Sequence, residues 1–230
     1  MLNTLQLAID TSTETASIAL VKDSKVLAEL TWCCGENHTV ELMPNLSYLL
    51  SQTGLSLQSV SCVIVATGPG SFNGLRVGVS TAKGLAFALS IPIVGISTLE
   101  AQAYQHAETG LPVCAVSNAG RGEIAVGMYQ KKRGGWRQLV VEHITTVDML
   151  CSEIRGKTVV CGEYLPALEQ IKKHLRQKAV MPTPAALVRR AGFLAELGQQ
   201  RINAGNYDEP ATLQPLYLRH PHITTPKRPY

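Results

Sequence analysis

The order of predicted strands and helices in the first half of this chain returns in its second half. In the first half, apolar and alternating runs predict three strands, a helix, a strand, a helix, a strand and a helix, at residues 5–9, 16–21, 26–32, 38–52, 62–66, 75–90, 91–96 and 98–107. The second half predicts the same order at residues 113–116, 123–129, 136–141, 146–154, 158–161, 165–175, 179–181 and 184–203. An offset of about 107 residues is too long for a solenoid and suits a duplicated domain, with coincidence as the alternative.

The order β-β-β-α-β-α-β-α is that of the RNase H-like, or actin-like, unit. Two such units in tandem resemble the superfamily of actin, Hsp70 chaperones and sugar kinases (ASKHA), in which ATP sits between the lobes. We therefore expect an α/β fold of two tandem RNase H-like domains, each with a mixed five-stranded sheet flanked by helices. The expected parts are an N-terminal lobe at residues 1–108, a C-terminal lobe at 109–205 and a tail at 206–230 that packs back on the first lobe.

The composition is that of a folded protein with an aliphatic core. The chain has 230 residues, of which 45% are hydrophobic and 17% charged, and its net charge of +4 is too small to argue for nucleic acid alone. Six cysteines form no C-x-x-C pair, so a zinc knuckle or redox motif is not expected. The chain shows no signal-peptide pattern, and its most apolar region, residues 85–96, is too short to span a membrane. We expect a reduced, cytoplasmic protein.

A glycine-rich loop connects a predicted strand to a predicted helix. It reads Gly68-Pro69-Gly70-Ser71-Phe72-Asn73-Gly74-Leu75-Arg76-Val77-Gly78. Such a loop can hold an anion or admit a closely packed partner. It is not a Walker A motif, because Leu75 stands where the phosphate-binding lysine is required. Arg76 fits an anion contact or an ordinary surface contact.

The end of the first predicted strand carries the candidate nucleotide contacts Asp10, Thr11 and Ser12. In the actin-like superfamily, a D-x-G-T/S turn at this place puts an acid near the metal and backbone N–H groups near phosphate. The alternative is an Asx turn, in which Asp10 satisfies its own backbone. The matching second-half turn has Asn118 for the acid, and the turn at 161–163 has a single glycine. Two usual nucleotide contacts are therefore weakened.

The two first-lobe helices predict a surface for another subunit and no metal site. His38 has Leu42 at the i+4 position, where a second metal ligand would stand, and Glu41 alone does not complete a ligand set. Glycines inside a helix cost about 1 kcal/mol each, so a stripe of small residues favours close approach by a partner, or by the protein's own sheet. The expected interface residues are His38, Glu41, Leu42, Leu46, Leu49, Gly74, Leu75, Gly78, Val79, Ala82 and Ala86.

Basic residues cluster at a predicted hairpin turn and in the tail. Lys131, Lys132 and Arg133 stand with Arg137, and residues 227–228 are Lys and Arg. The hairpin is interpreted first as a solvated turn, and contact with an RNA backbone is the sharper alternative.

With these residues in view, the chain resembles the TsaB (YeaZ) family. Residues 68–78 are similar to the family motif G-P-G-S-F-T-G-[LV]-R-[IV]-G, with Asn73 in place of Thr. Residues 8–12, 95–100 and 215–219 resemble its opening, its G-[VI]-S-T-L segment and its C-terminal P-x-Y-L-R. The chain departs from the family's D-A-R-x-x-E-[VI]-[YF] hairpin, where Asn118 and Gly120 stand for the Asp and the Arg and Ala125 for the aromatic, though Glu123 remains.

The resemblance implies a non-catalytic subunit of the system that makes threonylcarbamoyladenosine (t6A) at position 37 of ANN-reading tRNAs. It implies binding to the catalytic subunit TsaD through the first-lobe helices, with the ATPase TsaE joining, and a homodimer through the same surface when TsaD is absent. No catalytic residue and no cofactor of its own are implied, and ATP or ADP with Mg²⁺ would belong to the assembled complex. An actin-like small-molecule kinase or ATPase is the alternative, and a peptidase has the least support because no nucleophile–base or metal pair is visible.

Overall fold

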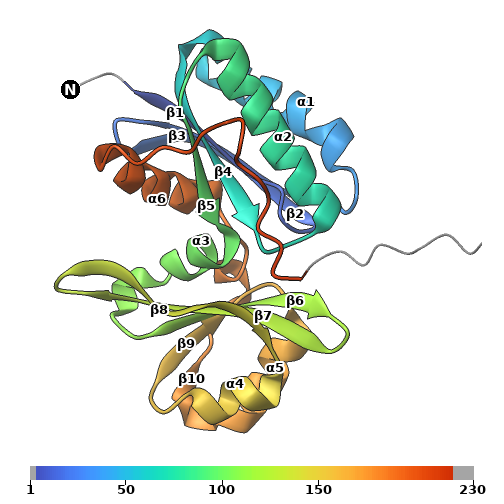
Figure 1. Ribbon diagram of the computed structural model, residues 1–230, viewed down its shortest axis with the longest axis vertical. Helices are drawn as coiled ribbons and strands as arrows, with labels where there is room; N and C mark the ends of the chain where they lie inside the picture. The colour runs from blue at the N-terminus through green and yellow to red at the C-terminus, as the bar shows by residue number, and fades with distance from the viewer. Residues whose placement is uncertain (1–3, 220–230) are drawn as a thin grey trace, which may run out of the picture.

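The computed structural model describes residues 4–219 and contains two five-stranded mixed sheets, as expected (Figure 1). The first sheet has the order β3-β2-β1-β4-β5. Its strands are β1 (Leu5–Asp10), β2 (Thr15–Lys22), β3 (Lys25–Cys33), β4 (Val60–Gly68) and β5 (Ile93–Ser97). β1 pairs antiparallel with β2 and parallel with β4, and β4 pairs parallel with β5. All six residues of β1 are buried, as in a strand covered on both faces.

The second sheet repeats this topology with the order β10-β9-β6-β7-β8. Its strands are β6 (Val113–Gly120), β7 (Glu123–Lys132), β8 (Gly135–Thr145), β9 (Thr158–Cys161) and β10 (Ala179–Val180). β6 pairs antiparallel with β7 and parallel with β9. The duplication predicted from the sequence pattern is therefore confirmed at the level of strand order.

Side-chain caps begin three of the helices. The helices are α1 (His38–Thr53), α2 (Phe72–Leu89), α3 (Thr98–Tyr104), α4 (Val147–Glu153), α5 (Leu165–Leu175) and α6 (Ala191–Asn203). Ser71, Ser97 and Thr146 accept backbone N–H groups at the starts of α2, α3 and α4. Pro44 lies inside α1 without ending it; Pro44 and the preceding-turn residue Val40 both lie on the exposed side of the helix.

The helix expected over residues 184–203 is wrong in extent and in place. The structure has a 3-10 turn at Pro184–Ala186 and a separate helix, α6, from Ala191. α6 packs on the first sheet, although it was expected in the second lobe, because Ala191, Leu194 and Ala195 meet the apolar face that includes Ala8 and Ile64. Figure 1 shows α6 beside β1 and β5.

The chain after α6 runs along the first lobe. Asp208 bridges to Ile93 of β5, and the Leu216 backbone N–H donates to the Thr67 carbonyl at 2.7 Å. Residues 220–230, with the basic pair at 227–228, lie outside the described residues. Among residues 4–219, no helix combines the length and apolarity needed to cross a bilayer.

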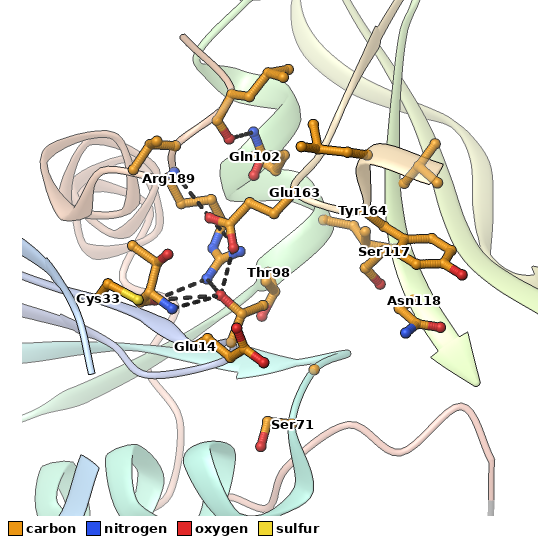
Figure 2. Close-up of a pocket in the computed structure, with 18 of the residues that line it drawn as sticks. Glu14, Cys33, Ser71, Thr98, Gln102, Ser117, Asn118, Glu163, Tyr164 and Arg189 are labelled. Atoms are coloured by element: carbon orange, nitrogen blue, oxygen red, sulfur yellow. Dashed lines mark hydrogen bonds and ion pairs between the residues drawn. The ribbon is translucent and has the colours of Figure 1, made fainter. Parts of the chain in front are cut away.

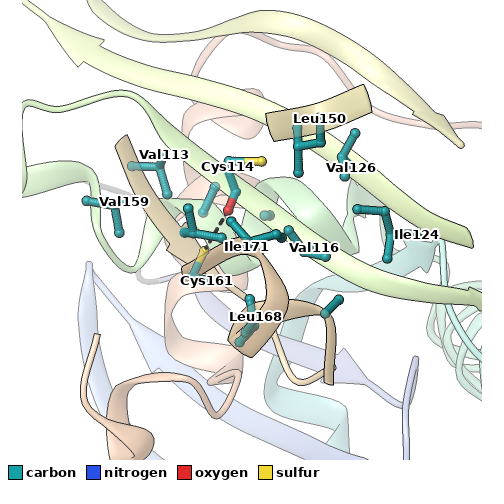
Figure 3. Packing of buried hydrophobic residues seen from close by; sticks show 14 of the residues in the cluster. Val113, Cys114, Val116, Ile124, Val126, Leu150, Val159, Cys161, Leu168 and Ile171 are labelled. Atoms are coloured by element: carbon teal, nitrogen blue, oxygen red, sulfur yellow. Dashed lines mark hydrogen bonds between the residues drawn. The ribbon is translucent and has the colours of Figure 1, made fainter. Parts of the chain in front are cut away.

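The second lobe has an aliphatic core with two buried cysteines. Figure 3 shows Cys114 and Cys161 among side chains of β6, β7, β9, α4 and α5, with the Cys161 thiol 3.7 Å from the Cys114 carbonyl. Burial raises the pKa of the Cys114 thiol to about 12, so that thiol stays protonated and serves as a small apolar residue. All six cysteines are free thiols.

An aromatic cluster and α3 connect the two lobes. Trp136 of β8 stacks on Tyr129 with ring centroids 5.7 Å apart and meets Tyr104 of α3 edge-on at 5.2 Å. Its indole N–H donates to the Glu100 carboxylate at 3.2 Å. At the adjacent hairpin turn, Lys131 forms an ion pair with Glu108.

Candidate functional site

A cavity of about 610 Å³ lies between the lobes, where ATP sits in the actin-like superfamily. Residues 13–15 and the 70–71 loop line it from the first lobe, and residues 116–118, 163–165, 184 and 187–189 line it from the rest of the chain. Figure 2 shows Glu14 and Cys33 on one side of this cavity and Ser117, Asn118 and Tyr164 on the other. The ends of β1, β6 and β9 therefore converge here, as the topology requires.

Arg189 occupies the position next to the candidate acid. Its Nε lies 2.8 Å from Asp10 Oδ2, and the side chains of Arg189 and Asp10 are 5% and 4% exposed. The other Asp10 oxygen accepts the Ser12 backbone N–H at 2.9 Å and the Ser12 hydroxyl at 2.5 Å. Both oxygens of the carboxylate thus have donors from the protein itself.

The same guanidinium also binds the acid that follows β9. Arg189 Nη1 lies 3.2 Å from Glu163 Oε1, and Nη2 donates to Thr13 Oγ1 at 2.9 Å. The Thr13 hydroxyl donates in turn to Glu163 Oε2 at 2.6 Å. We call Asp10, Thr13, Glu163 and Arg189 the buried ion-pair network, and it joins the β1 turn of one lobe to the β9 turn of the other. Figure 2 shows its Arg189 and Glu163 side chains next to each other.

The network fixes the charges of its members. Burial by itself raises the pKa of Asp10, but the Arg189 guanidinium and the Ser12 hydrogen bonds outweigh it, so the pKa lies below its usual value. Burial lowers the pKa of Arg189, and the carboxylates of Asp10 and Glu163 outweigh it and raise that pKa. Both groups are therefore charged at neutral pH.

The candidate acid Asp10 does not fit a role in holding a magnesium nucleotide. A magnesium site needs carboxylate or water oxygens that are free to turn to the ion, and a guanidinium already covers Asp10. Among the described lining residues the only cation is Arg189, and its charge is shared by two carboxylates. No group of three metal-ligating side chains occurs within residues 4–219.

The Asx turn is the geometry found at Asp10, Thr11 and Ser12. All three side chains are buried, and the Thr11 hydroxyl donates to the Gly74 carbonyl at 2.7 Å. None of the three lines the cavity. A nucleotide contact by this turn stays a prediction, and the observed contacts favour the structural alternative. The second-half turn is built alike, since Asn118 Oδ1 accepts the Gly120 N–H at 2.8 Å.

The glycine-rich loop packs on the β1–β2 turn. An added Cβ would lie 2.2 Å from the Ser12 carbonyl oxygen at Gly70, 2.1 Å from the Thr11 carbonyl oxygen at Gly74 and 2.3 Å from Thr11 Oγ1 at Gly78. Only glycine leaves room for this approach. Arg76 is exposed and lies over the Phe72 ring, 3.9 Å from its centroid. The motif residues Gly68, Pro69, Gly70, Ser71, Phe72, Gly74, Arg76 and Gly78 thus build the start of α2 against the first strand pair.

His38 is a buried hydrogen-bonding residue. Its Nε2 lies 2.7 Å from the Thr13 carbonyl oxygen, which requires a proton on that nitrogen. Its ring also stands against Gly74. Glu41 instead accepts the Trp32 indole N–H at 2.9 Å, so His38 and Glu41 do not share a ligand position.

Ten of the eleven expected interface residues are buried within the single chain, which disfavours direct contact with a partner, and their place in an interface stays a prediction. They face the interior of the single chain, because the apolar stripes of α1 and α2 cover their own sheet. Glu41 is half-buried and the other ten are buried: His38, Leu42, Leu46, Leu49, Gly74, Leu75, Gly78, Val79, Ala82 and Ala86. The small-residue stripe is thus explained by self-packing, the alternative that the sequence left open.

The outer face of the same two helices carries exposed apolar side chains. On α1, Val40 and Tyr48 are exposed, and on α2 Phe87 is 84% exposed. An added Cβ at Gly84 would meet no atom within 4 Å, and Ser80 one turn earlier is also exposed. We call Val40, Met43, Tyr48, Ser80, Gly84 and Phe87 the outer helix face. Gly84 is the helical glycine that self-packing does not explain.

Sequence reasoning missed Arg189 as the partner of Asp10 and of Glu163. Residues 189–190 form an Arg pair before α6, and the pattern predicted a continuous helix there. Their sequence separations from Asp10 gave no local signal, and only the docking of α6 on the first sheet brings Arg189 to the β1 turn.

A second cavity of about 410 Å³ opens beside the loop at 69–72. The tail contributes Tyr217, whose ring lies 5.2 Å from that of Phe72. Arg219 forms an ion pair with Glu123, one of the residues that this chain shares with the family hairpin.

Comparison with known proteins agrees with this architecture. Residues 33–152 match the family described as TsaD, tRNA N6-adenosine threonylcarbamoyltransferase. A protein of Bacillus subtilis named tRNA threonylcarbamoyladenosine biosynthesis protein TsaB is 34% identical over 93% of both chains. The chain belongs to the TsaB family. The Escherichia coli TsaB is 30% identical over 93% of this chain and 94% of its own.

A solved TsaB relative supports the fold over nearly the whole chain. The structure called YeaZ from Pseudomonas aeruginosa superposes with a TM-score of 0.81 at 27% identity, covering 94% of this chain and 100% of that chain. Proteins of the TsaB family take part in t6A biosynthesis, which agrees with the resemblance seen in the sequence motifs.

Proposed function

We propose that this chain is a non-catalytic subunit of the cytoplasmic machinery that attaches threonylcarbamoyl to adenosine 37 of ANN-reading tRNAs. It acts by binding the catalytic subunit TsaD, and TsaE joins the assembly. ATP or ADP and Mg²⁺ act in the assembled complex rather than in the cavity between the lobes of this chain. The observation that carries the proposal is the Arg189 guanidinium on Asp10, in a chain whose relatives are named TsaB.

The outer helix face supports the choice of docking surface. It presents apolar side chains from two adjacent helices, with Gly84 and Ser80 allowing another helix to approach closely. An apolar patch of this kind on a folded chain marks a protein contact. The same face would form the homodimer when TsaD is absent.

Reconstitution tests the proposed role. TsaD, TsaE, threonylcarbamoyl-adenylate, ATP and unmodified tRNA should give turnover only when this chain is added. The chain without TsaD should modify no adenosine. Turnover by this chain alone, or full turnover by TsaD and TsaE without it, would contradict the proposal.

The docking surface is tested by adding bulk at the open glycine. Gly84→Arg should keep the thermal unfolding temperature near that of the wild type and abolish both TsaD pull-down and the homodimer in sedimentation. Gln170→Arg, at an exposed position on α5, is the control that adds the same charge elsewhere. Normal TsaD binding by Gly84→Arg would rule out this face.

Calorimetry discriminates the alternative of an actin-like kinase or ATPase. A working Mg-ATP site would bind with low-micromolar affinity and lose it on Asp10→Ala. We expect no such heat, because Asp10 is covered by Arg189.

A further inference from the structure

Charge is distributed unevenly between the two lobes. Residues 1–108 contain 4 Lys and Arg against 8 Asp and Glu, while residues 109–188 contain 11 against 6. Such an asymmetry between halves points to a polyanionic partner for the basic half.

Four of the second-lobe cations stand in a repeated arrangement before two paired strands. Arg155-Gly156-Lys157 precedes β9, and Arg176-Gln177-Lys178 precedes β10. β9 and β10 are parallel, with Thr158 opposite Ala179. Arg155 and Arg176 each lie three residues before these two paired positions in the sequence, and Lys157 and Lys178 each directly precede them. We call these four residues the basic edge.

Like charges gather at the amino ends of β9 and β10, because Lys157 and Lys178 directly precede the paired residues Thr158 and Ala179. Neighbouring strands lie about 4.8 Å apart, so the two lysines start from adjacent places in the backbone, although both lie outside the strand ladder itself. All four residues are exposed, and none of their side chains has an ion pair or hydrogen bond to any residue within 4–219. The acids nearest to the basic edge in the sequence are Glu153 on α4 and Glu169 on α5, and neither pairs with any of its four residues. Asp148 on α4 pairs with His174 instead. An external anion would satisfy this arrangement.

The backbone at Arg176 adds independent support. Its φ is 51°, a conformation that glycine adopts freely and that costs other residues about 1–3 kcal/mol. A glycine would suit this turn better than the arginine that occupies it. Lys172 and Lys173 next to it are accounted for by the negative end of the α5 dipole, and they extend the positive surface.

We propose that the basic edge binds the phosphate backbone of an RNA. The edge lies at the amino ends of β9 and β10, whereas the cavity between the lobes lies at the carboxyl ends of β6 and β9. Figure 1 shows β10, α4 and α5 at the end of the second lobe away from the first sheet, so bound RNA would leave the outer helix face free. The inference rests on the proposed function, in which the substrate is a tRNA.

Binding of the full chain to an unmodified tRNA transcript, followed by fluorescence anisotropy over a series of salt concentrations, tests the proposal. Lys157→Ala with Lys178→Ala should weaken binding on the order of tenfold and make the slope of log affinity against log salt shallower by about two. Lys22→Ala with Lys25→Ala, at the β2–β3 turn of the first lobe, removes the same charge and should change affinity less than twofold.

Arg176→Gly is the second variant. It should leave the unfolding temperature equal or higher, because strain is relieved, and it should still weaken tRNA binding. Equal losses in the control pair, no binding by the wild type at low salt, or preferential competition by polyglutamate would each overturn the proposal. The same variants are also tested by pull-down with TsaD. A failure of TsaD binding would contradict the proposed function, whereas the tRNA affinities are measured without TsaD and test the basic edge separately.

Discussion

At the residue scale, one guanidinium decides the chemistry of the cavity between the lobes. Arg189 holds two carboxylates that come from different lobes, and all three groups are largely withdrawn from water. Removing one partner of a buried pair leaves an uncompensated charge, which costs far more than the pair contributes. The network is thus both a structural clamp and the reason why Asp10 is not available to a metal.

Replacing this guanidinium should destabilise the protein strongly. Arg189→Met is expected to lower the free energy of unfolding by about 3–5 kcal/mol, measured by urea denaturation. Lys131→Met is the control at an exposed pair: the side chains of Lys131 and its partner Glu108 are 43% and 85% exposed, so the loss should be small by comparison. Similar losses for both variants would show that Arg189 is not a special partner.

The lowered pKa of Asp10 predicts a dependence of stability on acid. The carboxylate contributes stability above its ordinary pKa of 3.8, and this contribution is lost as the pH falls toward the folded-state value. Between those values the unfolded chain binds the extra proton. The unfolding free energy of wild type should therefore fall more steeply below about pH 4 than that of Asp10→Asn. Equal slopes in acid-dependent denaturation would contradict the assignment.

At the element scale, α2 has one face for its own chain and another for solvent. Gly74 and Gly78 let the helix touch the β1–β2 turn, while Gly84 stands in open space. Helical spacing alone placed Gly74, Gly78, Ala82 and Ala86 on one stripe, and it did not say which neighbour that stripe met. An added Cβ at Gly78 would collide with Thr11, whereas at Gly84, six residues later, it would meet no atom within 4 Å.

The same substitution should have opposite effects at these two glycines. Gly78→Ala places a Cβ 2.3 Å from Thr11 Oγ1 and should cost about 1–3 kcal/mol. Gly84→Ala meets no atom and should gain up to about 1 kcal/mol from helix propensity. Thermal and urea unfolding of the two variants measure the difference, and a loss at both positions would show that Gly84 also packs within the chain.

At the scale of the whole molecule, sequence order and spatial grouping differ. α6 follows the second sheet in the sequence and covers the first sheet in space, and residues 206–219 continue along that lobe. The first lobe is consequently completed by segments from the end of the chain. The chain therefore passes from the first lobe to the second and back again.

A fragment of residues 1–108 should therefore not fold alone. Without α6, the face that includes Ala8, Ile64 and Val94 would be exposed to water, and the fragment should aggregate. Co-expression with residues 184–230 should recover a compact complex in size-exclusion chromatography. A monomeric, cooperatively unfolding 1–108 fragment would contradict this description.

The sequence by itself determined the strand order, the duplication and the family, because alternation, apolar runs and the 68–78 motif are local patterns. It also left open two interpretations of Asp10 and two of the small-residue stripe. The observed contacts favour the Asx turn for Asp10 and self-packing for the stripe. Only the tertiary structure decided where α6 docks, and hence that Arg189 meets Asp10 across 179 positions of sequence. The physical reason is that an apolar stripe on a helix shows that this face is buried but does not show which sheet buries it. Contacts between charges far apart in the sequence depend on that choice of sheet.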